Sequence, residues 1–338
     1  MKTTDVTAVK KLLSSPKKIA IIPHKNPDGD AMGSSLGLWL YLKKLGHEAG
    51  VIAPNDYPKF LKWLPGNEEV MIYEQAIASS SAIIEEADII FTLDFNALNR
   101  TGGLEPLLIR SEAIFIMIDH HRQPEDYAHY KYSDPDMCST SEMIYHFFEK
   151  LNGLNMMDKA IASCLYAGIM TDTGSFRFAS TTSTTHRVVA SLIDHGADNS
   201  EIHSQVYDNQ SYNRLQLLGR ALNNLHVIPE LHTAYITLTN NDLNTFKFQK
   251  GDTEGVVNYA LAVEGVVFAV IFIEHRQEDI IKVSLRSKGG FDVNTFARAH
   301  FNGGGHINAA GGRTDKSLQD TLSYFKSVLP KYKEALSI

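Results

Sequence analysis

The 338-residue chain has few cysteines and no long apolar run. Cys138 and Cys164 are its two cysteines, and they do not have the spacing of a zinc ribbon. We therefore expect unpaired thiols in a reducing compartment. No apolar run is long enough to cross a bilayer, and the opening residues MKTTDVTAVKKLLSS lack the apolar core of a signal peptide. These absences predict a cytoplasmic protein with no membrane partner.

The chain also lacks a surplus of positive charge. It has 32 Lys and Arg against 39 Asp and Glu, a net charge of −7. Proteins that follow long duplexes usually carry a basic surplus, so we expect a small or short substrate and no long duplex DNA. Apolar residues make up 43% and charged residues 21%, which is typical of a globular chain, and the length suits two domains.

The first half of the chain alternates apolar segments with helical patterns. Four short segments, residues 18–23, 49–54, 87–94 and 113–119, are almost continuously apolar. Such segments are typical of parallel strands that are covered on both faces. Residues 31–46 have a helical pattern that ends with Lys43, Lys44 and Gly46. A strand, a helix and a strand in this order predict an α/β fold with a doubly wound, mainly parallel sheet.

The second half has a different pattern. Helical segments dominate from residue 140 to about residue 225, and strands then alternate with helices to the end of the chain. We predict a catalytic domain at 1–210, a linker helix at 211–225 and a smaller α+β domain at 226–338.

Ligand-type side chains follow the predicted strands. The motifs are HKNPDGD (24–30), LDFN (93–96), DHH (119–121) and TDTG (171–174). The carboxyl ends of parallel strands meet at one edge of an open sheet, where ligands bind. Carboxylates about 4 Å apart repel by about 4 kcal/mol at an effective dielectric constant of about 20, so converging aspartates need protons or cations. Nearby imidazoles favour a transition metal, and a shared carboxylate matches two-metal phosphoryl chemistry.

Each motif alone has an ordinary explanation. Asp94 could cap a helix, PDG is a common turn, and adjacent histidines often lie on a surface. The joint occurrence of the motifs predicts one metal site. Within HKNPDGD, we expect Gly29 to relax the backbone between Asp28 and Asp30. A helix starting near Ala31 would direct its positive end at a phosphate.

Together the motifs resemble those of the DHH phosphoesterase superfamily, which is named for the triplet at 119–121. The segment FNGGGHINAAGG (301–312) resembles the glycine-rich motif of the DHH-associated domain found in RecJ-like members. The resemblance covers both halves of the chain. It implies an active site in a cleft between the two domains.

The resemblance also implies two divalent metal ions, with Mn²⁺ preferred and Mg²⁺ acceptable. It implies a ligand set in two parts: His24 and Asp28 for one ion, Asp30, His120 and Asp172 for the other, and Asp94 for both. His121 would face the substrate phosphate. Asp119 would orient an imidazole, as carboxylates near metal ligands commonly do.

Candidate substrate contacts lie mainly in the second domain. The amides of Gly303, Gly304 and Gly305 could form an anion nest, although a glycine-rich loop is by itself an ordinary feature. By resemblance, His306 and Arg286 would contact a substrate phosphate, with Ser287 beside them; a guanidinium suits bidentate contact. Arg100 and Arg177 each follow an aspartate ligand, and either could bind phosphate or pair with a carboxylate.

The resemblance favours a phosphoesterase of the bifunctional oligoribonuclease and pAp-phosphatase type. Such an enzyme would degrade short RNAs to mononucleotides and remove the 3′-phosphate of 3′-phosphoadenosine 5′-phosphate (pAp), using water activated between two metals. The alternatives are a standalone phosphodiesterase for cyclic or linear dinucleotides, such as cyclic di-AMP or pApA, and a non-catalytic nucleotide sensor. A pyrophosphatase is disfavoured, because those relatives have a different second domain. The polarity of RNA hydrolysis, the physiological metal and homodimer formation stay open.

Overall fold

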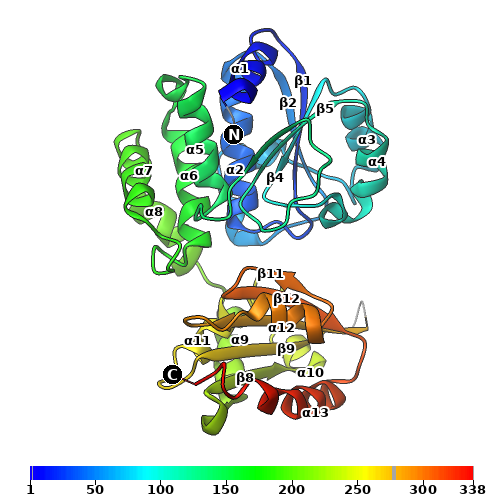
Figure 1. Ribbon diagram of the computed structural model, residues 1–338, viewed down its shortest axis with the longest axis vertical. Helices are drawn as coiled ribbons and strands as arrows, with labels where there is room; N and C mark the ends of the chain where they lie inside the picture. Colours follow the sequence, from blue (N-terminus) through cyan, green and yellow to red (C-terminus); the bar gives the residue numbers. More distant parts are fainter. Residues whose placement is uncertain (2, 276–278, 338) are drawn as a thin grey trace. The chain divides into compact units, whose positions relative to one another are not determined.

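The computed structural model describes residues 1, 3–275 and 279–337. The chain divides into two compact units, residues 1–209 and 210–338. Figure 1 shows both, coloured along the sequence. None of the described helices combines the length and the apolarity that crossing a bilayer requires.

Within its described residues, the first unit contains a six-stranded parallel sheet in the order β3-β2-β1-β4-β5-β6. The strands are β1 Lys18–Pro23, β2 Glu48–Ala53, β3 Met71–Ile72, β4 Ile89–Leu93, β5 Ile114–Asp119 and β6 Tyr130–Ser133. This order is that of a doubly wound fold, whose direction of winding switches between β1 and β4. The predicted fold class is confirmed, and the four predicted strands are β1, β2, β4 and β5. The short edge strands β3 and β6 have too few apolar residues to be recognised from the sequence.

Helices cover both faces of this sheet (Figure 1). They are α1 Thr3–Leu12, α2 Gly29–Lys44, α3 Ile77–Glu85, α4 Glu105–Arg110, α5 Thr140–Lys150, α6 Lys159–Asp172, α7 Ser183–Asp194 and α8 Asn199–His203. Alternate residues of β1 are buried in different cores: Ile19 and Ile21 on the side of α2, α5 and α6, and Ala20 and Ile22 on the side of α3 and α4. Burial on both faces explains why these strands are almost continuously apolar.

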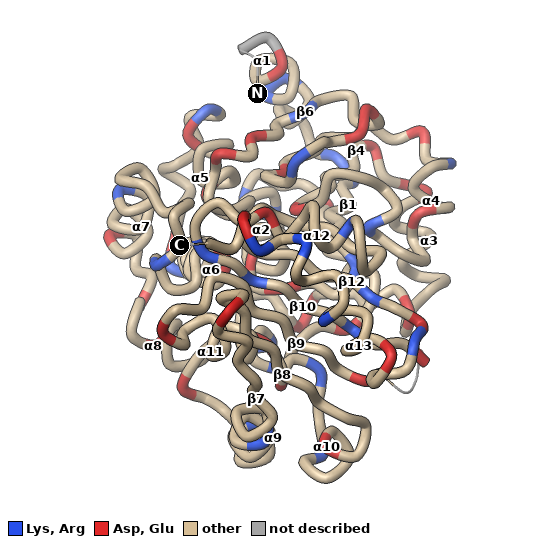
Figure 2. Tube along the Cα trace, turned by 60° about the horizontal axis from the view of Figure 1, so that its bottom comes forward, with Lys and Arg blue, Asp and Glu red and all other residues tan. Residues whose placement is uncertain are grey.

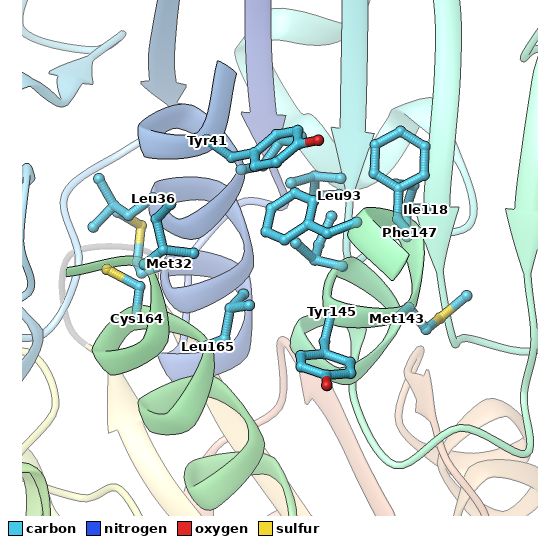
Figure 3. Close-up of a cluster of buried hydrophobic side chains, with 14 of the residues drawn as sticks. Met32, Leu36, Tyr41, Leu93, Ile118, Met143, Tyr145, Phe147, Cys164 and Leu165 are labelled. Carbon is cyan, nitrogen blue, oxygen red and sulfur yellow. The ribbon is translucent and has the colours of Figure 1, made fainter. Parts of the chain in front are cut away.

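The larger core lies between the sheet and helices α2, α5 and α6 (Figure 3). Leu93 at the end of β4 is fully buried there with Leu36 of α2 and Phe147 of α5. Burying one such side chain contributes about 1.5–3 kcal/mol, so this core holds the strand ends firmly. Cys138 and Cys164 are buried as free thiols, as the sequence predicts.

Helices α2 and α6 approach each other closely through glycine. A Cβ atom at Gly33 would lie 2.5 Å from the carbonyl oxygen of Cys164, and one at Gly29 would overlap the side chain of Thr171. Gly29 is the first residue of α2, so the prediction that it relaxes a loop is wrong; it permits the close approach instead. This packing brings Asp30 near the start of α2 toward Asp172 at the end of α6.

The described residues of the second unit include a six-stranded mixed sheet in the order β11-β12-β10-β9-β8-β7. The strands are β7 Leu225–Ile228, β8 Thr233–Leu238, β9 Phe268–His275, β10 Ile280–Ser287, β11 Gly304–Gly305 and β12 Ala309–Thr314. Strands β8 and β9 pair in parallel, and the other neighbours pair antiparallel. The predicted α+β character of this half is confirmed.

The helices of the second unit are α9 Tyr212–Asn223, α10 Asn240–Thr245, α11 Val256–Leu261, α12 Val293–His300 and α13 Leu318–Val328. Helices α9, α10 and α11 pack on one face of the sheet, and α12 and α13 pack on the other. The sequence predicts residues 211–225 as a linker helix. Leu217 and Ala221 of α9 are buried against the sheet, so this helix is part of the second unit. The apolar stripe of α9 packs into this core. A sequence pattern alone does not show whether an apolar helix packs into a core or links two domains.

Candidate metal centre

Three neighbouring strands end at the candidate site. His24 follows β1, Asp94 follows β4, and Asp119 ends β5 directly before His120 and His121. Strands β1, β4 and β5 are adjacent and parallel, so their carboxyl ends share one edge of the sheet. The site therefore begins at the switch point, where doubly wound sheets bind ligands.

The first cluster consists of His24, Asp28 and Asp94, whose candidate ligand atoms all lie within 4.8 Å of one another. His24 Nε2 is 3.5 Å from Asp94 Oδ2 and 3.8 Å from Asp28 Oδ2. Asp28 is also the N-cap of α2, because its Oδ1 accepts from the amides of Asp30 and Ala31. One carboxylate oxygen thus holds the helix, and the other faces the cluster.

The second cluster consists of Asp30, His120 and Asp172, again with ligand atoms within 4.8 Å. His120 Nε2 is 3.5 Å from Asp172 Oδ2 and 3.9 Å from Asp30 Oδ2. Asp172 is the last residue of α6, at the negative end of the helix dipole, where a carboxylate is unfavourable. A bound cation would offset that repulsion.

Asp94 connects the two clusters. Its Oδ1 is 3.4 Å from His120 Nε2, and its Oδ2 is 3.5 Å from His24 Nε2. The residue is 2% exposed and has φ +65°, a left-handed conformation that is uncommon outside glycine. Such strain costs about 1–3 kcal/mol and persists where the surrounding structure holds it. The geometry suits a carboxylate shared by two cations.

Hydrogen bonds orient the two imidazoles of the clusters. Nδ1 of His24 is 2.8 Å from the carbonyl oxygen of Lys25, and Nδ1 of His120 is 3.2 Å from that of Met137. A carbonyl oxygen can only accept, so each Nδ1 carries the proton of its hydrogen bond. In the neutral ring, Nε2 then presents its lone pair to the carboxylates, as metal-binding histidines require.

His121 has a comparable partner. Its Nδ1 is 2.8 Å from Asp119 Oδ1, and Asp119 is fully buried. The same Nδ1 is 3.7 Å from Asp94 Oδ1, so His121 lies beside the shared carboxylate. The predicted orienting pair of Asp119 and His121 is therefore present in the structure as a contact.

Protons can balance the clustered carboxylates when no cation is bound. Burial would lower the pKa of His24, but the adjacent carboxylates of Asp28 and Asp94 outweigh it and raise this pKa to about 10. Burial raises the pKa of Asp172 to about 6. Burial and the charges of Asp94 and Asp172 also raise the pKa of Asp30. The site thus takes up positive charge either as protons or as bound cations.

The donor set fits divalent ions. Carboxylate oxygens and inward-facing imidazole nitrogens lie close together in two groups that share a residue. Mixed oxygen and nitrogen donors suit Mn²⁺ and similar ions better than Ca²⁺. The six predicted ligands are thus brought together and could hold two ions.

The start of α5 holds two of these carboxylates, which the sequence did not predict. The amides of Thr140 and Ser141 donate to Asp30 Oδ2 and Oδ1 at 2.6 and 2.8 Å. The hydroxyl of Thr140 donates to Asp94 Oδ1 at 3.0 Å. The first amides of a helix have no partner within the helix and favour negative charge, so they suit this task.

A buried glutamate anchors the start of α5. Glu142 is 1% exposed, and its Oε2 accepts from the Cys138 thiol at 2.7 Å and from the Thr185 hydroxyl of α7 at 2.9 Å. Burial would raise the pKa of Glu142, but the His146 imidazole 3.7 Å away and the hydrogen bonds from Cys138 and Thr185 lower it. The Ser139–Glu142 pattern predicts an N-cap, and Ser139 does cap α5. No sequence pattern, however, predicts that the start of α5 contacts the carboxylates of Asp30 and Asp94, which are distant in sequence.

Arg100 and Arg177 do not pair with the clusters. Arg177 is exposed, and its Nε donates to the carbonyl oxygen of Gly174 at 2.7 Å. Arg100 is half-buried. Among the described residues, neither guanidinium has an ion pair with the clustered carboxylates, so phosphate binding is the prediction that remains for them.

The glycine-rich loop of the second unit does not form the predicted anion nest. The amides of Gly303, Gly305 and His306 donate to acceptors of the protein, at 3.3, 3.0 and 2.7 Å: Ala297 O, Asn294 Oδ1 and Ala309 O. A Cβ atom at Gly303 would overlap the carbonyl oxygen of Gly311, and Gly305 has φ +149°. These glycines therefore let β11 lie directly against β12. Gly304, between them, pairs with Gly311 in the same ladder.

Arg286 and Ser287 end β10. Arg286 is half-buried, and its Nη1 donates to the carbonyl oxygen of Leu285 at 3.0 Å. Ser287 is 6% exposed; its hydroxyl donates to Phe291 O at 2.6 Å and accepts from Asn308 Nδ2 at 2.9 Å. Ser287 thus uses its only proton to hold the loop. Substrate contact by Arg286 stays a prediction.

Two family models match the chain. The DHH family N-terminal domain matches residues 18–169, and the DHHA1 domain matches residues 232–331. The chain is 34% identical over 335 residues to the bifunctional oligoribonuclease and PAP phosphatase NrnA of Thermus thermophilus, covering 98% of this chain and 94% of that protein. The chain is a phosphoesterase, a hydrolase. The chain belongs to the DHH family.

Other known proteins are also similar to this chain in sequence or in fold. NrnA of Bacillus subtilis is 30% identical over 85% of this chain and 86% of its own. A crystal structure of an exopolyphosphatase-related protein from Bacteroides fragilis is 37% identical, with a TM-score of 0.95 over 99% of this chain and 98% of that one. RecJ from Thermus thermophilus in complex with Mn²⁺ has a TM-score of 0.56 over 98% of this chain and 54% of that one at 14% identity, which shows the shared fold alone.

Proposed function

We propose that this protein is a divalent-metal-dependent phosphoesterase that hydrolyses short oligoribonucleotides to mononucleotides and pAp to AMP. The NrnA proteins of Thermus thermophilus and Bacillus subtilis, which carry both activities in their names, support the substrate class. The observation that carries the chemistry is Asp94, whose two oxygens face different clusters at 3.4 and 3.5 Å. A cytoplasmic location, with the two cysteines as buried thiols, belongs to the same proposal.

The ligands divide between two ions. His24 and Asp28 would hold the first ion, and Asp94 would be shared. Asp30, His120 and Asp172 would hold the second ion. Two ions bound in this way would supply Lewis-acid stabilisation of the phosphoryl oxygens and activate a water molecule near neutral pH. We take Mn²⁺ as the preferred ion, because imidazole ligands favour it over Mg²⁺.

The remaining residues bind and orient the substrate. Asp119 accepts a hydrogen bond from Nδ1 of His121 at 2.8 Å, and in the doubly protonated ring the Nε2–H group can donate to a non-bridging phosphate oxygen. Such a contact strengthens as charge develops on that oxygen during attack. Arg286 and His306 of the second unit bind a further phosphate, and Arg286 suits this role because its guanidinium can form two parallel hydrogen bonds.

A phosphodiesterase for dinucleotides is the second candidate. The cyclic-di-AMP phosphodiesterase GdpP of Bacillus subtilis is 27% identical over 97% of this chain, but this chain covers only 50% of that protein. This similarity is lower than that to the NrnA proteins. Initial rates on linear and cyclic dinucleotides therefore decide between the candidates.

The test is a comparison of initial rates with Mn²⁺, with Mg²⁺ and with EDTA. The substrates are pAp, pApA, a five-nucleotide RNA and cyclic di-AMP, each at the same concentration. We expect rapid turnover of pAp and of the RNAs with Mn²⁺, slow turnover of cyclic di-AMP, and none with EDTA. Faster turnover of cyclic di-AMP than of pApA would favour the second candidate. Binding without turnover of any substrate would indicate a sensor.

A further inference from the structure

We propose that Asn55 is a positioning residue for the metal centre, because it fixes the peptide group to which the imidazole of His24 is hydrogen-bonded. The inference deepens the proposed function and rests on it for the role of His24 as a metal ligand. It concerns the first unit alone. Asn55 lies outside the four sequence motifs that supply the candidate ligands.

A single peptide group connects Asn55 to His24. It is the group between Lys25 and Asn26, whose carbonyl oxygen accepts from Nδ1 of His24 at 2.8 Å and whose N–H donates to Asn55 Oδ1 at 2.7 Å. A trans peptide group is planar, so its carbonyl oxygen and its N–H point in opposite directions. Holding the N–H therefore also directs the carbonyl oxygen at the imidazole. Hydrogen bonds in such a chain polarise one another, which makes the carbonyl oxygen a stronger acceptor.

The side chain of Asn55 is well placed for this role. It lies just after β2 and is 8% exposed. Within the described residues, both hydrogen bonds of its amide go to Asn26, since Oδ1 accepts from the main-chain N–H and Nδ2 donates to Asn26 Oδ1 at 2.8 Å. A main-chain N–H can only donate, so it fixes which end of the Asn55 amide faces it. A buried amide thus uses both of its polar ends on one residue of the loop between His24 and Asp28.

This loop needs support from its surroundings. Asn26 has φ +57°, a left-handed conformation that asparagine adopts more readily than most residues but that persists only where neighbouring groups hold it. The segments after both strands that flank β1 provide contacts. The carbonyl oxygen of Arg100, after β4, accepts from the N–H of Lys25 at 2.7 Å, and Asn55, after β2, holds the next N–H. The peptide group that orients His24 is therefore fixed from the β2 side.

The connection from Asn55 to His24 carries no charge. Asn26 and Asn55 are neutral, whereas the aspartates of the site are among the red positions in Figure 2. A carboxylate at position 55 could accept the same hydrogen bond, but it would add to the repulsion among the clustered carboxylates. A neutral amide orients the imidazole without that cost.

Hydrogen exchange and metal binding test the role of Asn55. Asn55→Leu keeps the approximate size of the side chain and removes its hydrogen bonds, and Asn55→Asp keeps an acceptor for the N–H of Asn26. The control is Asn67→Leu, which removes a 2.7 Å hydrogen bond from the Tyr57 hydroxyl in the same unit. Amide exchange at Asn26 is measured by NMR in the ion-free protein, and Mn²⁺ affinity is measured by calorimetric titration.

We expect Asn55→Leu to speed the exchange of the Asn26 amide, because its N–H loses its acceptor. Mn²⁺ binding at the first cluster should weaken about tenfold, the lower end of the range for groups that orient a metal ligand. Asn55→Asp should retain slow exchange, and Asn67→Leu should change neither quantity. In a His24→Ala background, Asn55→Leu should cause no further loss of Mn²⁺ affinity, because the imidazole through which Asn55 acts is absent.

Three results would overturn the proposal. They are unchanged exchange at Asn26 in Asn55→Leu, equal losses of Mn²⁺ affinity in Asn55→Leu and Asn67→Leu, and a loss from Asn55→Leu that persists in the His24→Ala background. If Asn55→Leu does not fold, the unaltered protein supplies the test: loading with diamagnetic Zn²⁺ should slow exchange at Asn26, because an ion that fixes the imidazole also fixes the peptide group. Unchanged exchange on loading would contradict the connection.

None of these measurements needs turnover. A protein that binds Mn²⁺ but hydrolyses none of the substrates would defeat the proposed reaction and leave the role of Asn55 in metal binding intact. Failure of the proposed reaction and failure of this inference are therefore seen in separate measurements.

Discussion

The two units differ in net charge and in where their sheets present functional side chains. Residues 1–209 carry 18 Lys and Arg against 27 Asp and Glu, a net charge of −9, whereas residues 210–338 carry 14 against 12, a net charge of +2. In the first unit, both faces of the parallel sheet are buried, so functional side chains lie at the strand ends. In the second unit, β10 has alternating burial, so side chains along a strand can contact a ligand. Covering a sheet on both faces confines a site to its edge.

The largest expected effect is on the shared carboxylate of the first unit. Asp94→Asn keeps the shape of the side chain and removes its charge, so we expect turnover of pApA to fall by about 10²–10³-fold, the loss typical of a group that stabilises transition-state charge. Circular dichroism should show an unchanged fold. Hydrolysis at the original rate would contradict the assignment of Asp94 as the bridging ligand.

The next effect is on metal affinity as pH changes. The pKa of His24 is raised from its ordinary value of 6.5 to about 10 in the ion-free protein. Below pH 10 the folded site holds this proton, which an incoming ion must displace. The neighbouring carboxylates also raise the pKa of His120 despite its burial, so Mn²⁺ affinity should rise at least tenfold for each pH unit from pH 6 to 8. The proton on His24 stabilises the ion-free fold fully below pH 6.5, and this stability is lost as pH rises through 10. Calorimetric titration with Mn²⁺ measures the slope, and affinity independent of pH would contradict it.

A smaller effect is expected at the start of α5. Thr140→Ala removes the hydroxyl that donates to Asp94 at 3.0 Å, and Mn²⁺ affinity should fall about tenfold to a hundredfold, the range for residues that orient metal ligands. Thr140→Ser retains the hydroxyl and should retain the affinity. If Thr140→Ala lowers thermal stability but not Mn²⁺ affinity, the residue has a structural role only.

The smallest effect belongs to the second unit. Arg286→Ala should raise KM for short RNA about tenfold, through loss of a charged hydrogen bond, while the Mn²⁺ content of the first unit stays unchanged. Lys326→Ala, on the opposite face of the sheet, is the control. Loss of Mn²⁺ in Arg286→Ala would contradict the division of roles between the units.

Much of the first unit could be predicted because its signals are local. The strand ends carry His24, Asp94 and the 119–121 triplet, and parallel strands bring their ends to one edge whatever the details of packing. Prediction was less successful for glycine. The sequence predicts that Gly29 relaxes a loop and that Gly303 binds an anion. In the structure, Gly29 lets α6 pack closely against α2, and Gly303 lets β12 pass next to it.

The sequence by itself determined the doubly wound order of elements, the two-domain division and the set of acidic and imidazole side chains, because these follow from local apolar patterns and from motifs a few residues long. Only the tertiary structure decided that Thr140 and Ser141 hold Asp30, that α9 belongs to the second core, and that Asn55 holds the main-chain N–H of Asn26. Those facts depend on which segments pack together and in which register. Contacts between residues far apart in the chain leave no periodic signal along it.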